Sequence, residues 1–266
     1  MLGHPITHSL SPALHRAAYA AAGLDWSYDA VDVRSAELAG FLHGLDPTWR
    51  GLSLTMPLKR VATGLLDELT DRAQQALAAN TVVLEPGRRV GHNTDIPGAA
   101  RALAQRHTGA LDAAVVLGGG ATASSVLLAL ADLGCARVTL LVRDLARAAE
   151  TVAAARRHPR PPRVDVAPLG EWTGGADVLV STIPAEAQTP AVVALADRVR
   201  TVFEVIYDPW PTPLAVAATS SGKPLVAGLD LLVAQAVLQF RLMTGLDLDP
   251  SAVMRAAGEA ALRDRG

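Results

Sequence analysis

The stretch AAVVLGGGATASSVLLALADLGCARVTLLVRD, residues 113–144, decides the fold class of this chain. It begins with the apolar run Val115–Leu117, passes through a glycine triplet, and continues into a helix-length run of small and aliphatic residues. A second apolar run, Val138–Val142, follows. The pattern predicts a buried strand, a glycine loop, a helix and a second strand, and strands joined by such a helix pair in parallel.

The same alternation continues toward the C-terminus. We expect strands within ADVLVSTIP (176–184), TVFEVIYDP (201–209) and PLVAG (224–228), with helices between them and again after residue 230. The basic, proline-rich stretch RRHPRPPR (156–163) is expected to be a solvated connector.

The first hundred residues show a similar mixture of elements. Alternating strands and helices predict a parallel sheet in each half of the chain, and therefore an α/β protein. The expected elements are a helix from Ser11 (its N-cap) and Pro12, strands within 26–33 and 49–57, a second short helix at 35–45, a helical stretch at 59–77 broken near Gly64, and a hairpin over 80–95 turning at Pro86-Gly87.

Bulk composition excludes several classes of protein. The chain has 266 residues, enough for two modest domains, and half of them are hydrophobic. A net charge of −2, from 24 basic and 26 acidic side chains, argues against binding to nucleic acid or to anionic membranes. Cys135 is the single cysteine, so no internal disulfide is possible and a cytoplasmic location is expected. We see no signal peptide and no metal-ligand spacing.

The glycine loop fits the pattern G-x-G-x-x-A. Gly118 permits the tight turn, Gly120 permits a pyrophosphate to approach the backbone, and Ala123 allows close packing of the helix on the strand. The intervening residues Gly119, Ala121 and Thr122 belong to the same predicted loop and helix start. A plain tight turn between strand and helix is the structural alternative.

Two arginines follow the second strand, where NAD-binding folds usually place an acidic residue. Arg143 and Arg147 suit a 2′-phosphate through bidentate hydrogen bonding, which favours NADP over NAD. Their alternative is an ordinary surface position. Asp144 weakens the preference, because it either neutralises the site or itself accepts from a ribose hydroxyl.

Three polar clusters in the first half suggest a site for a small, hydroxyl-rich anion. They are Ser9 with Ser11, Thr55 to Lys59, and Asn80-Thr81 with Asn93 to Asp95. Hydroxyls suit a carboxylate, amides suit ring hydroxyls, and a lysine paired with an aspartate moves a proton. Taken singly, each residue has a structural alternative: Ser11 and Asp95 as helix caps, Lys59 on the surface, Asn80 in a turn.

The motifs GHPITHSLSPALH, LSLTMPLK, AANT, GHNTDIPG, VLGGGATAS, VRDLARA, VIYDPWPTPL and AGLDLLVAQAV occur in this order over nearly the whole chain. Together they resemble the shikimate dehydrogenase family. The resemblance implies a substrate domain at 1–96 and 232–266, with the final helices returning to it, and a Rossmann NADP-binding domain at 97–231. It also implies reversible NADPH-dependent reduction of 3-dehydroshikimate to shikimate, a step of chorismate and aromatic amino acid biosynthesis, in a monomer or homodimer.

The resemblance also assigns roles to residues. It makes Lys59 and Asp95 the catalytic pair and Ser9 and Ser11 the binding pair for the substrate carboxylate. Thr55, Asn80, Tyr207 and Gln235 would contact or line the rest of the substrate site. Cofactor binding would fall to Gly118, Gly119, Gly120, Ala121, Thr122, Ala123, Arg143, Arg147 and Gly228.

Several positions depart from the family pattern. Ser53 stands where an asparagine is common, and Val142, Asp144 and Val180 replace polar residues on the cofactor side. Only Met1 and Leu2 precede Gly3, so we expect a missing upstream start or an impaired first strand. These departures leave open a quinate or aminoshikimate dehydrogenase with relaxed use of NAD and NADP, and a non-catalytic regulator that binds shikimate or NADP.

Overall fold

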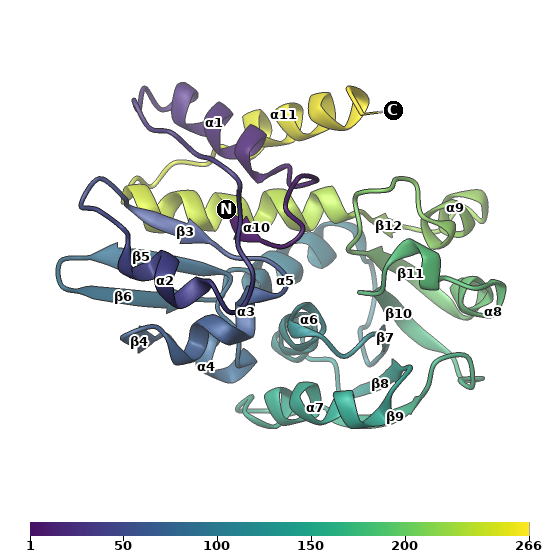
Figure 1. Cartoon of the computed structure of the whole chain (residues 1–266). Helices are drawn as coiled ribbons and strands as arrows, with labels where there is room; N and C mark the ends of the chain where they lie inside the picture. Colours follow the sequence, from purple (N-terminus) through teal and green to yellow (C-terminus); the bar gives the residue numbers. More distant parts are fainter. Residues whose placement is uncertain (266) are drawn as a thin grey trace. The chain divides into compact units, whose positions relative to one another are not determined.

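The computed structural model describes residues 1–265, and of Arg147 it describes the backbone alone. The chain divides into two compact units, one made of Met1–Thr94 with Leu232–Gly266 and the other of Asp95–Leu231 (Figure 1). Among the described residues, no helix is long and apolar enough to cross a membrane.

The unit of residues 95–231 is built on a six-stranded sheet in the order β12-β11-β10-β7-β8-β9, with every pairing parallel. The helices α5, α6 and α7 lie side by side on one face, and α8 and α9 cover the other (Figure 1). The bounds are α5 Asp95–Arg106, β7 Ala113–Leu117, α6 Ala121–Asp132, β8 Arg137–Val142, α7 Ala148–Arg156, β9 Arg163–Pro168, β10 Ala176–Ser181, α8 Pro190–Val193, β11 Val199–Glu204, α9 Pro213–Ser220 and β12 Leu225–Val226.

This topology confirms the predicted α/β class and the strand–glycine–helix–strand unit. The chain runs from β7 outward to β9, then returns to the other side of β7 with β10. The strand order therefore reverses between β7 and β10, and in open sheets of this kind ligands bind beyond the carboxyl ends of the strands at that reversal. Val115, Leu117, Leu141, Leu179 and Val202 form part of the buried core.

The edge strand β9 is missing from the sequence prediction. The proline-rich connector does separate α7 from β9, as expected. In β9 itself apolar and polar residues alternate, as in Val164, Asp165 and Val166, and the strand is largely exposed. An edge strand has a partner on one side only, so it lacks the long apolar run that marks β7 and β8.

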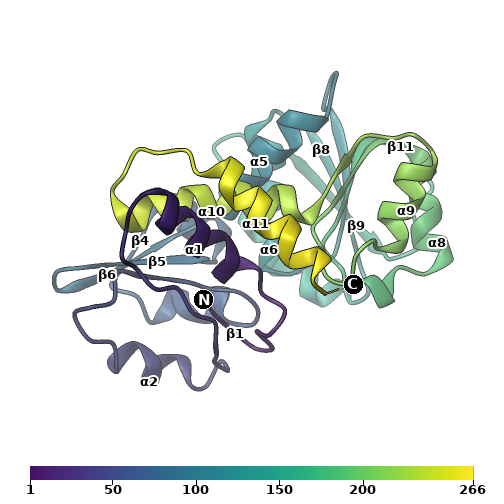
Figure 2. The same ribbon diagram turned by 90° about the horizontal axis from the view of Figure 1, so that it is seen from above.

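The unit of residues 1–94 and 232–266 contains a four-stranded sheet, β3-β5-β6-β4, and a two-stranded sheet, β1-β2. The helices α1 and α11 lie side by side, as both views show (Figure 2). The bounds are β1 Leu2–Gly3, α1 Ser11–Ala21, β2 Val31–Asp32, α2 Leu38–His43, β3 Gly51–Ser53, α3 Leu58–Val61, β4 Glu68–Leu69, α4 Asp71–Ala76, β5 Thr81–Glu85, β6 Arg88–His92, α10 Gly228–Thr244, which continues from the other unit, and α11 Ser251–Arg263.

The prediction of a parallel sheet in the first half is wrong. β5 pairs antiparallel with both β3 and β6, while β4 pairs with β6 and β1 with β2 in parallel. The turn Pro86-Gly87 is too short for a parallel crossover, so it forces the predicted hairpin to be antiparallel. The expected helical stretch at 59–77 is likewise broken by β4, which pairs with Val90 and Gly91.

The first strand is short but paired. Leu2 and Gly3 pair with Val31 and Asp32, and Leu2 also bridges to Leu54. Leu2 is fully buried among the apolar residues of α2, α3 and β3. The predicted strand at 26–33 is reduced to β2, because only two residues face β1.

Candidate functional site

The glycine loop follows β7 directly. Gly118 has a φ of +102°, and a Cβ built there would lie 2.5 Å from the Thr182 hydroxyl oxygen, so only glycine fits. Gly120 is the N-cap of α6 and itself makes no side-chain capping bond, and a Cβ on Gly120 would meet nothing within 4 Å among the described residues. Helix-start N–H groups without intrahelical partners next to open space suit a phosphate.

Two buried hydroxyls behind the loop fix its backbone. Thr151 on α7 donates from Oγ1 to the carbonyl oxygen of Gly119 at 2.9 Å, and Ser124 Oγ donates to Thr151 Oγ1 at 3.2 Å. In a trans peptide the carbonyl and the following N–H point in opposite directions. The N–H of Gly120 therefore points away from Thr151.

The residues after β8 have distinct roles. Arg143 is exposed, and Asp144 Oδ1 accepts from the backbone N–H of Ala146 at 3.0 Å, which caps the short 3-10 helix Leu145–Arg147. Asp144 is thus engaged in a helix cap. The side chain of Arg147 lies outside the described part of the structure. Val142 and Val180, where the family pattern has polar residues, are buried within their strands.

The two serines of the first loop lie at the start of α1. The predicted N-cap role of Ser11 is wrong: the helix begins at Ser11 with Leu10 before it, and Ser9 Oγ accepts from the Ser11 N–H at 3.3 Å. Pro12 lies in the first turn of the helix, where its missing N–H costs no intrahelical bond. The Ser11 side chain is buried.

Asn80 and Gln235 come together although they are 155 residues apart. Asn80 Oδ1 accepts from the backbone N–H of Thr94 at 2.8 Å, and its Nδ2 donates to Gln235 Oε1 at 3.4 Å. Gln235 Nε2 donates to the Leu232 carbonyl oxygen at 2.8 Å, which leaves its oxygen facing Asn80. Both side chains are buried, so each amide is held in one orientation.

Backbone hydrogen bonds hold Thr55 and Lys59 to neighbouring parts of the chain. The Thr55 N–H donates to the Leu2 carbonyl oxygen at 2.9 Å, and the Lys59 carbonyl oxygen accepts from Ala79 N–H at 2.8 Å. Lys59, half-buried on α3, is therefore tied to the residue that precedes Asn80. Asp95, buried, is the first residue of α5 and of the other unit.

Tyr207 and Gly228 both belong to the unit of residues 95–231. Tyr207 lies in the loop after β11, and a Cβ on Gly228 would lie 2.5 Å from the Val205 carbonyl oxygen, so glycine is required where α10 starts. Glu204, which the sequence did not single out, accepts from the Ile206 N–H and from Gln188 and Thr212 at the base of this loop. Burial raises the pKa of Glu204 despite these donors.

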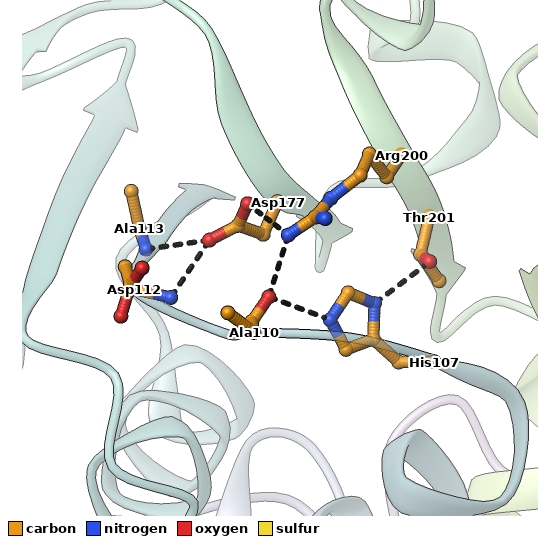
Figure 3. A network of polar contacts seen from close by, with 7 residues as sticks. All are labelled: His107, Ala110, Asp112, Ala113, Asp177, Arg200 and Thr201. Carbon is orange, nitrogen blue, oxygen red and sulfur yellow. Dashed lines mark hydrogen bonds and ion pairs between the residues drawn. The ribbon is translucent and has the colours of Figure 1, made fainter.

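A further polar network lies at the amino ends of β7, β10 and β11 (Figure 3). Asp177 accepts from the N–H groups of Asp112 and Ala113 and pairs with Arg200. Burial favours a higher pKa for Asp177, but the Ala113 and Asp112 N–H groups and Arg200 hold it below its usual value. The glycine loop follows the opposite, carboxyl end of β7, so this network ties the sheet together and does not belong to the candidate site.

Comparison with known proteins identifies the family. Family models described as shikimate dehydrogenase substrate binding domain and shikimate 5'-dehydrogenase C-terminal domain match residues 1–82 and 228–257. The shikimate dehydrogenase (NADP(+)) of Desulfitobacterium hafniense strain Y51 is 35% identical over 244 residues, which cover 89% of this chain and 88% of the relative. The chain belongs to the shikimate dehydrogenase family.

Solved structures of other shikimate dehydrogenases share the whole fold. The Mycobacterium tuberculosis protein is 41% identical with a TM-score of 0.88, covering 98% of this chain and 97% of that one. The Thermus thermophilus protein, solved in complex with NADP(H) and shikimate, is 33% identical with a TM-score of 0.83 and 98% coverage of both chains. The two-unit α/β architecture is therefore that of the shikimate dehydrogenase family.

Proposed function

We propose that this chain catalyses the reversible NADPH-dependent reduction of 3-dehydroshikimate to shikimate. The observation that carries the proposal is the buried pair of amides, Asn80 and Gln235, held in fixed orientations within a shikimate dehydrogenase fold. Amides held in fixed orientations offer hydrogen bonds to ring hydroxyls in set directions, and each such bond contributes about 0.5–1.5 kcal/mol.

The serine pair supports recognition of the substrate carboxylate. Ser9 and Ser11 stand at the start of α1, where helix-end N–H groups and hydroxyls favour a negative charge. Binding the carboxylate at one end and the hydroxyls at the other orients the ring, and orientation is itself a large contribution to rate.

The residues of the glycine loop fit a dinucleotide. Gly118 and Gly120 provide the turn and the open approach, the start of α6 provides N–H donors, and Arg143 provides a guanidinium for a 2′-phosphate. Bound NADPH supplies hydride chemistry, which the protein does not carry itself. Since Asp144 caps a helix, we assign the discrimination between NADP and NAD to Arg143.

Proton transfer is assigned to Lys59 and Asp95. The Lys59 ammonium donates a proton to the substrate oxygen that gains charge during reduction, and Asp95 holds and orients that ammonium in the working enzyme. The backbone bond between Lys59 and Ala79 supports this role, because it ties the proton donor to the Asn80 segment that recognises the ring.

The proposal is tested by following NAD(P)H absorbance with the purified protein and four mixtures, shikimate or quinate with NADP⁺ or NAD⁺. We expect fast turnover with shikimate and NADP⁺ only. Turnover with quinate or NAD⁺ would assign the chain to the quinate or aminoshikimate branch. Binding of NADP⁺ without turnover in any mixture would support a regulator instead.

A further inference from the structure

A continuous series of hydrogen bonds between buried polar side chains leads from Tyr28 to Asn80. Tyr28 Oη donates to Ser53 Oγ at 2.6 Å, and Ser53 Oγ donates to Gln239 Oε1 at 2.9 Å. Gln239 Nε2 donates to Thr81 Oγ1 at 2.9 Å, and Thr81 Oγ1 donates to Asn80 Oδ1 at 3.0 Å. We call Tyr28, Ser53, Gln239 and Thr81 the relay.

Strand geometry explains why these groups meet. Ser53 and Thr81 are direct partners across β3 and β5, so their side chains point to the same face of the sheet. Their neighbours Leu52 and Val82 point to the other face and join the apolar core. Gln239 lies on α10 one turn beyond Gln235, and its amide spans the Ser53–Thr81 pair.

The direction of each hydrogen bond in the relay follows from Gln239. Its Nε2 also donates to the Asn80 carbonyl oxygen at 3.2 Å, so its Oε1 must accept from Ser53. Ser53 then has no second proton to give and accepts from Tyr28. At the far end Thr81 donates to Asn80 Oδ1, which also accepts from the Thr94 backbone N–H. The relay therefore reinforces the orientation in which the Asn80 oxygen faces Thr81 and its Nδ2 faces Gln235.

The relay stays uncharged near neutral pH. Burial raises the pKa of Tyr28, and burial lowers the pKa of the adjoining His15 to about 3, although its hydrogen bond to Gln239 opposes this. The His15 ring is stacked on Tyr28 at 4.2 Å. No change of charge therefore disturbs these hydrogen-bond directions under ordinary conditions.

We propose that the relay is a positioning device that holds the Asn80 amide in the orientation that the substrate site requires. Thr81 donates to the Asn80 side-chain oxygen. Gln239, Ser53 and Tyr28 in turn fix the direction of the Thr81 hydroxyl. The relay residues are positioning residues and act through Asn80. The inference rests on the proposed function, because it takes Asn80 to bind a ring hydroxyl.

The first test is Tyr28→Phe, which keeps the ring stacked on His15 and removes the hydroxyl that starts the relay. We expect the KM for shikimate to rise about 3- to 10-fold, the size of one lost hydrogen bond. Turnover number and the Kd for NADP⁺ should stay within about 2-fold, because Asn80 binds substrate and transition state alike. The matched control is Tyr19→Phe, in the same buried aromatic cluster, whose hydroxyl has no hydrogen-bond partner among the residues that the structure describes.

The second test asks whether the relay acts as a unit. Gln239→Met removes the amide at its centre, and we expect the double variant Tyr28→Phe/Gln239→Met to have about the KM of the more affected single variant. If Gln239→Met does not fold, Ser53→Ala replaces it in the same cycle. The relay would be overturned if the two single-variant increases in KM multiplied in the double variant. It would also be overturned if Tyr28→Phe and Tyr19→Phe had the same KM for shikimate. A wild-type protein that neither turns over nor binds shikimate would instead overturn the proposed function.

Discussion

The Thr151 hydroxyl donates a 2.9 Å hydrogen bond to the Gly119 carbonyl oxygen and thereby orients the peptide between Gly119 and Gly120. Thr151→Val keeps the shape of the side chain and removes this donor. We predict that the Kd for NADP⁺ rises about 3- to 10-fold, because the Gly120 N–H loses its fixed direction. Isothermal titration calorimetry measures the change directly.

Thr151→Ser serves as the control for that prediction, since it restores the hydroxyl. It should bind NADP⁺ nearly as well as the wild-type protein, and shikimate affinity should be unchanged in both variants. Equal NADP⁺ affinity in Thr151→Val and wild type would mean that the glycine loop holds its geometry without Thr151.

Arg143 is predicted to select NADP⁺ over NAD⁺. Arg143→Ala should weaken NADP⁺ binding roughly 10- to 100-fold, the size of a lost charge-assisted hydrogen bond, and leave NAD⁺ nearly unaffected. Arg137→Ala is the matched control, because Arg137 is also exposed but lies at the other end of β8. An equal loss for both cofactors in Arg143→Ala would contradict a role in binding the 2′-phosphate.

Lys59→Ala is expected to lower kcat by about 10²–10⁴-fold, as for loss of a general acid, with little change in the Kd for NADP⁺. Lys59→Arg keeps the positive charge but holds its proton too tightly to donate it, so it should be similarly slow. Steady-state kinetics on both variants separate proton donation from charge alone. Wild-type turnover in Lys59→Arg would show that charge is sufficient.

Much of the fold was predictable because its signals are local. The apolar runs of β7 and β8 and the Pro86-Gly87 turn each lie within a few consecutive residues, and the structure confirms the strand–loop–helix unit and the hairpin. The edge strand β9 and the two-residue strands β1 and β2 carry no such run. Their pairing depends on partners far along the chain, which periodicity does not report.

Some residues of the candidate site could likewise be predicted from local sequence, and others could not. Loop residues such as Ser9, shortly before α1, and Asn80, directly before β5, stand out because they match a family motif. Gln239 and Thr151 lie within ordinary helical patterns, and nothing in the surrounding sequence marks them. Their roles arise from tertiary contacts, such as the bond from Ser53 to Gln239 across 186 residues.

His15 is predicted to make the stability of its unit depend on pH. Burial lowers its pKa from 6.5 in the unfolded chain to about 3 in the folded protein. Between these values the unfolded chain binds the extra proton, so stability falls as the pH falls below 6.5. From about pH 6.5 to about pH 5 this single group should cost about 1–2 kcal/mol.

The test compares urea unfolding of the wild-type protein and of His15→Phe at several pH values between about 5 and about 7.5. Phenylalanine retains an aromatic ring against Tyr28 and has no group that titrates, so the variant should lose about 1–2 kcal/mol less than the wild type over this range. Tyr19→Phe perturbs the same cluster without removing a group that titrates here, because burial raises the pKa of Tyr19 to about 12, and it should keep the wild-type slope. Parallel pH profiles for wild type and His15→Phe would mean that the folded protein accommodates a protonated His15.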